Sequence, residues 1–149
     1  MTNTEELCEK AAAYFLEGYN CAQAVLLTLS EHMGEKNELI PKIASGFGGG
    51  IGRCGSVCGA LAGSVMAVGI KFGTNERGVQ KRALAYENSC RLYKQFEKQY
   101  SSVMCRDLIN CDLSNPEEQA RARREKIFET KCSCFVKTAV QNFLNLEER

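Results

Sequence analysis

The chain has 149 residues, a formal net charge of +1, 44% hydrophobic and 25% charged residues, which is typical of one globular domain. So small a net charge gives no strong attraction for nucleic acid or an acidic membrane surface. The polar N-terminal segment lacks the apolar core of a signal peptide, and the longest apolar run, residues 57–70, is too short and glycine-rich to span a bilayer. We therefore expect a cytoplasmic protein that binds neither nucleic acid nor a membrane.

The first two predicted helices have clear start and stop signals. Residues 2–18 and 20–34 each begin with a residue that can cap a helix, and each range ends at a glycine. In the second helix Asn20 is the predicted N-cap, which makes Cys21 the first helical residue. Free backbone N–H groups and the helix dipole favour a thiolate at that position.

The middle of the chain predicts two longer helices. Residues 55–72 form a helix after a glycine-rich loop, and residues 75–100 form the longest helix of the chain. One stripe of the second helix is apolar at a helical period, which core packing explains better than a cofactor site. That stripe consists of Val79, Ala83, Tyr86, Cys90, Tyr93 and Tyr100.

Helical signals continue to the C-terminal end. Residues 114–130 place a capping residue before Pro116 and acidic residues in the first turn, and residues 132–146 carry an apolar face. No segment alternates with the two-residue period of a strand. We therefore predict an all-α fold, a single cysteine-rich domain over residues 1–149 built as a bundle of about five to seven helices.

Nine cysteines stand out in a chain of this composition. In a reducing compartment so many cysteines indicate metal ligands or redox thiols, and the odd number leaves one thiol outside any scheme of disulfides. Cys54 and Cys58 are four apart, so on a helix they would share one face and could chelate a metal or form a disulfide. Arg53 and a helix start beside them predict thiolates of lowered pKa.

The glycine-rich stretch around these cysteines does not fit a nucleotide site. A dinucleotide fingerprint needs a preceding strand, and a P-loop ends in Gly-Lys-Ser/Thr, where this chain has Arg53 and Cys54. Gly55, Gly59 and Gly63 are instead spaced by four, which lets another backbone approach a helix closely and brings N–H donors near a sulfur. We therefore expect Gly55 and Gly59 to shape a cofactor site.

Two further pairs of cysteines lie in the second half of the chain, Cys105 with Cys111 and Cys132 with Cys134. Cys132 and Cys134 cannot both point to the same side of a helix, so one of the two is expected to face inward. An iron–sulfur cluster is typically held by four thiolates, and zinc is the other metal that takes four. The only histidine, His32, gives little basis for histidine-based zinc catalysis or a serine triad.

Four segments, in this order, resemble the C_GCAxxG_C_C family of redox-active proteins. They are YNCAQAVLL at 19–27, ASGFGGGIGRCGSVCGALAG at 44–63, CRDLINCDL at 105–113 and KCSCFV at 131–136. The hallmark Cys-Gly-Ala-x-x-Gly matches residues 58–63, and the resemblance covers about residues 15–145.

The resemblance implies a small helical protein with four characteristic cysteines. They map onto Cys21, Cys58, Cys105 and either Cys132 or Cys134, with Cys132 preferred. Family members often carry a hydrophobic residue where this chain has Cys54, which makes Cys54 an accessory thiol. A related domain occurs in split-Soret cytochromes, where the cysteines are associated with an iron–sulfur cluster. This chain has no C-x-x-C-H motif, so we expect no covalent haem.

Three functional hypotheses follow. The first is a redox protein whose Cys21, Cys58, Cys105 and Cys132 hold an iron–sulfur cluster and pass electrons to a redox partner protein. The second is a metal-free thiol–disulfide oxidoreductase with Cys58 as nucleophile and Cys54 or Cys21 as resolving thiol. The third is a structural zinc protein without turnover. The small-residue helix faces are also compatible with a homodimer.

Overall fold

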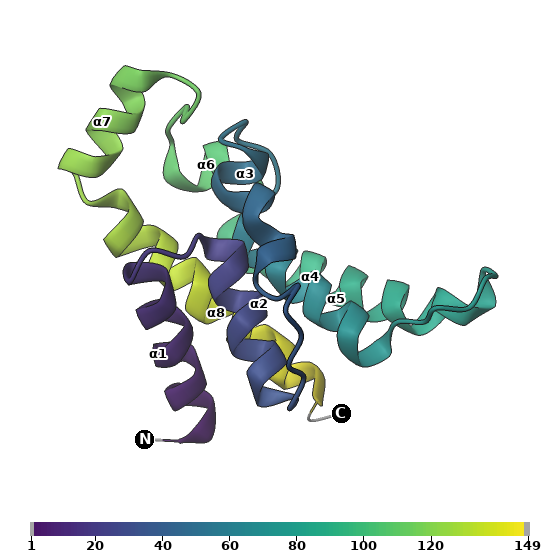
Figure 1. Cartoon of the computed structure of the whole chain (residues 1–149). Helices are drawn as coiled ribbons and strands as arrows, with labels where there is room; N and C mark the ends of the chain where they lie inside the picture. The colour runs from purple at the N-terminus through teal and green to yellow at the C-terminus, as the bar shows by residue number, and fades with distance from the viewer. Residues whose placement is uncertain (1, 148–149) are drawn as a thin grey trace.

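The computed structural model describes residues 2–147, and every regular element in that range is helical (Figure 1). Its α-helices are α1 (Asn3–Leu16), α2 (Cys21–His32), α3 (Gly48–Ile51), α4 (Gly59–Phe72), α5 (Ala83–Tyr100), α6 (Cys105–Ile109), α7 (Pro116–Arg124) and α8 (Ser133–Glu147). Two 3₁₀ turns, η1 (Lys42–Phe47) and η2 (Gln80–Arg82), and one π-helical turn, η3 (Phe128–Cys132), complete the list.

The all-α prediction is confirmed, but the number of helices was set too low. The described residues contain eight α-helices because two loop segments each close a short helical turn, α3 and α6. Neither turn has an apolar repeat long enough to be read from the sequence. Within residues 2–147, no helix has both the length and the hydropathy of a membrane span.

The predicted caps of the first two helices are present. The Asn20 side chain accepts a hydrogen bond from the Gln23 N–H at 2.9 Å, and the Gln23 side chain accepts one from the Asn20 N–H at 3.0 Å. This capping box starts α2 at Cys21, as the sequence predicts. Gly18 and Gly34 follow the ends of α1 and α2 with φ of +123° and +75°, a conformation that ends a helix.

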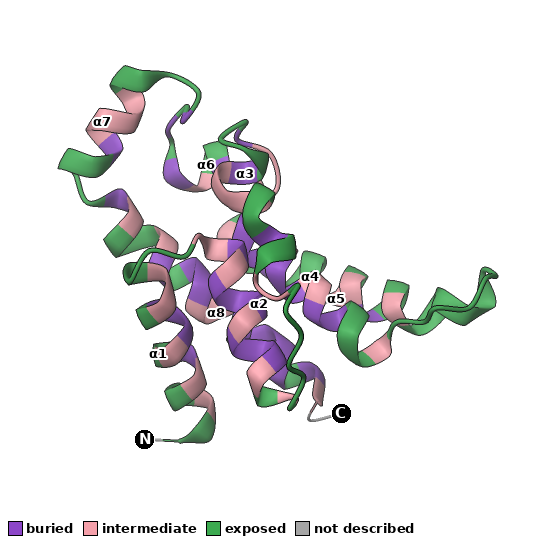
Figure 2. Cartoon of the chain, viewed as in Figure 1, coloured by how far each residue is buried: buried purple, intermediate pink, exposed green. Residues whose placement is uncertain are grey.

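The core lies between α2, α4 and α8, with α1 packed on α2 and α8 and α5 packed on α4 and α8 (Figures 1 and 2). Helices α2 and α4 make a close backbone contact at a glycine of α4. A Cβ atom on Gly63 would lie 2.6 Å from the Ala22 carbonyl oxygen, so only glycine allows this contact. The spacing of glycines in α4 therefore serves helix packing, as predicted for Gly59 and Gly63.

Helix α4 starts four residues later than predicted. Gly55 lies before the helix with φ of +73°, and Cys58 is the N-cap residue. Because Cys54 precedes the helix and is exposed while Cys58 is buried, the two do not share a helix face. The prediction of a helical Cys54–Cys58 pair is therefore wrong.

Helix α5 also differs from the prediction, both in its start and in its buried face. It begins at Ala83 rather than near residue 75, and its buried residues are Asn88, Leu92 and Phe96. Most of the predicted apolar stripe faces outward instead, with Tyr86 66% exposed, whereas Tyr100 packs against Phe135. The helix carries two apolar faces, and the one with Leu92 and Phe96 packs on α4 and α8.

Candidate functional site

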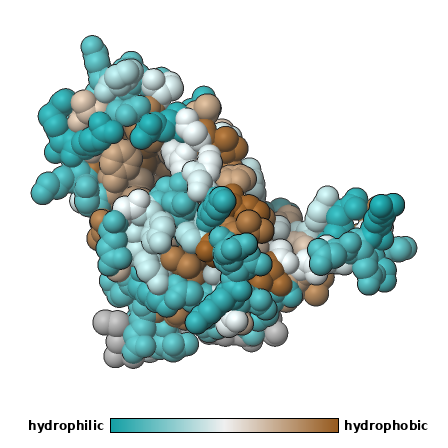
Figure 3. Space-filling model, in the orientation of Figure 1, coloured by the Kyte–Doolittle hydropathy of each residue, from teal (hydrophilic) through white to brown (hydrophobic). Residues whose placement is uncertain are grey.

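Four cysteines from distant parts of the chain line one cavity of about 500 Å³. We call them the cavity cysteines: Cys21, Cys58, Cys105 and Cys132. They are the four residues that the sequence favoured as ligands. The cavity is bounded by the N-terminal end of α2, the glycine-rich segment, α6, α7 and η3, and Figure 3 shows a hollow lined with apolar side chains (brown) under α7.

Cys21 is the first residue of α2, and backbone N–H groups surround its sulfur. The backbone N–H groups of Cys21 itself, Ala22, Gly49 and Gly59 all favour the thiolate form of this sulfur. Gly59 lies so close that a Cβ atom there would be 2.3 Å from the sulfur. Helix α2 and the start of α4 thus direct unpaired N–H groups at one sulfur, which favours negative charge on it.

Cys58 and Cys105 are held together by a short antiparallel bridge between their loops. The Cys58 N–H donates to the Val103 carbonyl at 2.8 Å, and the Cys105 N–H donates to the Ser56 carbonyl at 2.7 Å. Arg106 reinforces the same bridge, because its Nε donates to the Gly55 carbonyl at 3.0 Å. The backbone therefore fixes the positions of Cys58 and Cys105 relative to each other.

The glycine-rich segment forms a left-handed turn that reaches two of the cavity cysteines. Residues 49–53 all have φ between +54° and +69°, including the non-glycine residues Ile51 and Arg53. Left-handed conformations in succession are rare for L-residues and depend on glycine. A Cβ atom on Gly50 would lie 2.7 Å from the Cys105 Cβ, so the turn packs directly on Cys105.

Cys132 reaches the cavity from a π-helical turn. It is the last residue of η3, and α8 begins at the next position. A π-helical turn inserts an extra residue into a helix and is often found at functional sites. The choice between the two C-terminal cysteines is thereby clear in the geometry, because Cys132 lines the cavity whereas Cys134 is exposed and donates to the Thr130 carbonyl.

Burial raises the thiol pKa values in this cavity. Burial, with smaller contributions from the neighbouring Cys21 and Cys111, raises the pKa of Cys105 to about 12. The pKa values of Cys58 and Cys132 are also raised, first by burial and then by the nearby thiols. For Cys21, burial outweighs the N–H groups that favour its thiolate. The expectation of a lowered pKa at Cys58 is therefore wrong in the metal-free protein, because desolvation dominates.

The remaining five cysteines lie outside this cavity lining. Cys54, Cys90 and Cys134 are exposed, whereas Cys8 and Cys111 are buried. The two buried thiols each donate to a backbone carbonyl, Cys8 to Lys137 at 3.5 Å and Cys111 to Glu118 at 3.2 Å. Gly55 likewise does not line the cavity but supports the bridge, while Gly59 lines it as expected.

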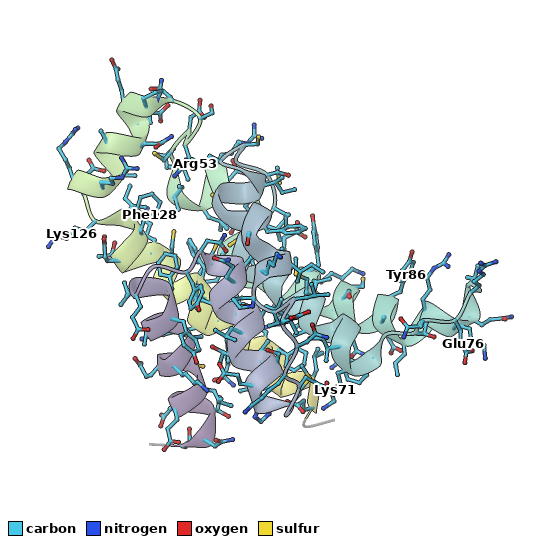
Figure 4. All side chains as sticks on the ribbon, in the orientation of Figure 1. Arg53, Lys71, Glu76, Tyr86, Lys126 and Phe128 are labelled. Carbon is cyan, nitrogen blue, oxygen red and sulfur yellow. The ribbon has the colours of Figure 1, made fainter. Side chains whose placement is uncertain are left out.

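Two arginines and an aromatic side chain line the cavity, and of these the sequence predicts only Arg53 near the site. Arg53, Arg123 and Phe128 line the cavity, and Figure 4 shows Arg53 and Phe128 near the gap beneath α7. Among residues 2–147, neither Arg53 nor Arg123 forms an ion pair. Arg123 belongs to the basic run RARREK, which by sequence alone looks like an ordinary solvated helix face.

The described residues contain no group of three or more His, Cys, Asp or Glu side chains arranged to hold a metal ion. The four cavity cysteines line one cavity without forming such a group.

Comparison with known proteins gives one family and one relative. A family model described as "Putative redox-active protein (C_GCAxxG_C_C)" matches residues 19–146. A protein of Archaeoglobus fulgidus that carries the name "Uncharacterized protein" is 29% identical over 130 residues, which is 81% of this chain and 86% of the relative. No solved structure matches. The matched range of the family model includes all four cavity cysteines.

Proposed function

The chain belongs to the C_GCAxxG_C_C family of redox-active proteins, and from this we propose that it is an electron-transfer protein whose cavity cysteines bind an iron–sulfur cluster. The observation that carries the proposal is the convergence of four cysteines on one cavity. They are separated by 37, 47 and 27 positions along the chain, and four thiolates are the ligand number of common clusters. When bound, such a cluster accepts and releases single electrons.

The surrounding backbone supports this proposal. Iron–sulfur sites are tuned by hydrogen bonds to sulfur, and four backbone N–H groups favour the thiolate form of Cys21. Arg53 and Arg123 add positive charge without a carboxylate partner in the described residues, which suits a site that gathers four thiolates. The role of the chain is thus to bind the cluster, to exclude water with apolar side chains and to balance negative charge.

Burial of the thiols favours a metal-bound site over free nucleophiles. A thiol must lose its proton to attack a disulfide, and the raised pKa of Cys58 opposes that step at neutral pH. Metal binding removes the same proton by coordination. In the alternative metal-free mechanism the resolving thiol would be Cys21, which shares the cavity, rather than the exposed Cys54.

The experiment is a redox titration of protein reconstituted anaerobically with iron and sulfide. We expect a brown protein whose visible charge-transfer absorption bleaches with dithionite and returns on reoxidation. A disulfide protein would remain colourless and would change its free-thiol count on mild oxidation. Zinc in place of iron, with no response to reductant, would support the structural metal protein instead.

A further inference from the structure

One face of α5 and of the turn before it exposes apolar side chains at regular spacing. The positions are Val79, Ala83, Tyr86, Cys90 and Tyr93, which we call the α5 seam. Val79 is 72% exposed, Tyr86 66% and Tyr93 44%, and the other two are exposed as well. Their spacing alternates between four and three, which is the repeat by which two helices pack along a seam.

We propose that the α5 seam is the surface through which two copies of this chain form a homodimer, with α5 of one copy packed along α5 of the other. The core of the chain does not use this face, since Leu92 and Phe96 are buried on another side of the helix. Exposed apolar side chains that repeat along one helix face are typical of a helix–helix interface. The pattern therefore predicts that the seam side chains are buried in an interface, and a second copy of the chain would cover them.

The seam meets the core of its own chain at one end. The next residue of the stripe toward the C-terminus, Tyr100, packs edge-on against Phe135 with ring centroids 4.9 Å apart, and its hydroxyl lies 2.6 Å from the Thr138 hydroxyl. The opposite end projects beyond the other helices (Figure 1), and its ribbon is coloured mostly as exposed in Figure 2. Tyr86 points away from the ribbon in Figure 4.

The residues beside the seam carry both negative and positive charges, so the seam of one copy can pair its charges with those of a second copy. This favours a second copy as the occupant. Three charged residues flank the seam. Arg82 lies five positions before Glu87, and Lys94 lies seven positions after it. Within the described residues, none of these three forms an ion pair. Glu87 can meet Arg82 of the second copy if the helices are parallel, and Lys94 of the second copy if they are antiparallel.

Helix α5 is long enough to present the seam over several helical turns. Helix α5 has 18 residues, about 27 Å at 1.5 Å per residue. Arg82 lies over the Tyr86 ring, with its Cζ atom 5.4 Å from the ring centroid. The planar guanidinium group and the ring therefore lie together at the centre of the seam. The net charge of +1 means that two copies repel each other little.

The test is the molar mass of the full chain in solution, by sedimentation equilibrium, for the wild type and for Tyr86→Lys. We expect twice the chain mass for the wild type and the mass of one chain for Tyr86→Lys. The control is Leu39→Lys, which alters a side chain that is 52% exposed elsewhere and should stay dimeric. A monomeric wild type, or a dimeric Tyr86→Lys protein, overturns the proposal.

Cross-linking gives a second readout that does not depend on a variant that weakens the dimer. Cys90 lies within the seam, so its sulfur should come near that of the second copy. In a chain with the other exposed cysteines removed (Cys54→Ser, Cys134→Ser), a short bismaleimide should join two chains through Cys90. Cys90→Ser should remove the product. If the reagent modifies Cys90 but never cross-links two chains, the proposal is overturned. Unchanged circular dichroism shows that each variant is folded.

Discussion

The Cys21 sulfur occupies the space that a side chain on Gly59 would need. A Cβ atom there would lie 2.3 Å from that sulfur and 2.9 Å from the Phe47 carbonyl oxygen. Glycine therefore allows the start of α4 to bring its N–H group against the first residue of α2. This contact joins Cys21 to the segment that begins at Cys58, so the site should be sensitive to any side chain at Gly59.

Replacing Gly59 with alanine should damage the site more than the fold. The added methyl group must displace Cys21 or the Phe47 carbonyl, and overpacking of this kind costs about 1–3 kcal/mol. We expect Gly59→Ala to lose most of its iron on reconstitution while retaining its helical circular dichroism. Iron analysis and a urea denaturation curve measure the two effects separately.

Gly69→Ala is the matched control in the same helix. No atom lies within 4 Å of a Cβ built at Gly69, so this change should stabilise the protein by about 0.5–1 kcal/mol and keep the iron content of the wild type. Normal iron binding by Gly59→Ala would show that the contact between Gly59 and Cys21 does not shape the site.

The thiols of the metal-free, reduced protein should react with iodoacetamide in a fixed order. Cys54 and Cys134 are exposed and should be alkylated first, whereas Cys58 is 5% exposed with a raised pKa and should react last. Peptide mass spectrometry over a time course measures the order. Rapid alkylation of Cys58 in folded protein would argue for an activated nucleophile and against a buried ligand.

Removing the Arg106 side chain should loosen the bridge that fixes Cys58 and Cys105. Arg106 donates to the Gly55 carbonyl at 3.0 Å and to the Cys54 carbonyl at 3.2 Å, and each such bond contributes about 1 kcal/mol. We expect Arg106→Ala to release iron to a chelator several-fold faster than the wild type. The exposed Arg124→Ala should release it at the wild-type rate, and equal rates in all three proteins would contradict the role of the bridge.

Glu31 should contribute to stability in a way that is lost in acid. Its carboxylate accepts from the Tyr14 hydroxyl at 2.6 Å and from Lys10 Nζ at 3.1 Å. Burial alone raises the pKa of Glu31, but these two partners outweigh it and hold the pKa below its ordinary value of 4.5. A lowered folded-state pKa stabilises the protein above pH 4.5, and this stability is lost as the pH falls through the folded-state value.

Denaturation midpoints measured across this pH range test the role of Glu31. The fall in stability below pH 4.5 should be shallower for Glu31→Gln, which has no carboxylate to protonate. Tyr14→Phe removes one of the two partners and should lie between Glu31→Gln and the wild type. If all three proteins lose stability with the same slope, Glu31 has no such role.

Local signals in the sequence are sufficient to predict much of this structure. The Asn20 cap, the helix stops at Gly18 and Gly34 and the small-residue contact at Gly63 follow from short-range preferences. The resemblance to a family named four cysteines, and the fold brings those four to one cavity. How the intervening loops position these cysteines cannot be predicted from short-range signals.

The missed features depend on contacts between distant segments. Five successive left-handed residues cannot be read from a glycine-rich stretch, because the bridge between Val57 and Met104 helps to fix that loop. Arg123 looks like a surface residue until η3 and α7 place it at the cavity. In α5 two apolar faces compete, and periodicity alone cannot tell which one packs on α4.

Iron and acid-labile sulfide content after anaerobic reconstitution tests the central claim most directly, because it compares cysteines inside and outside the cavity. The wild type, Cys54→Ser and Cys134→Ser should bind iron and sulfide in equal amounts. Serine at Cys21, Cys58, Cys105 or Cys132 should abolish or strongly reduce both. Wild-type protein without iron and sulfide, or a Cys132→Ser protein that binds as much as Cys134→Ser, would contradict a cluster held by the four cavity cysteines.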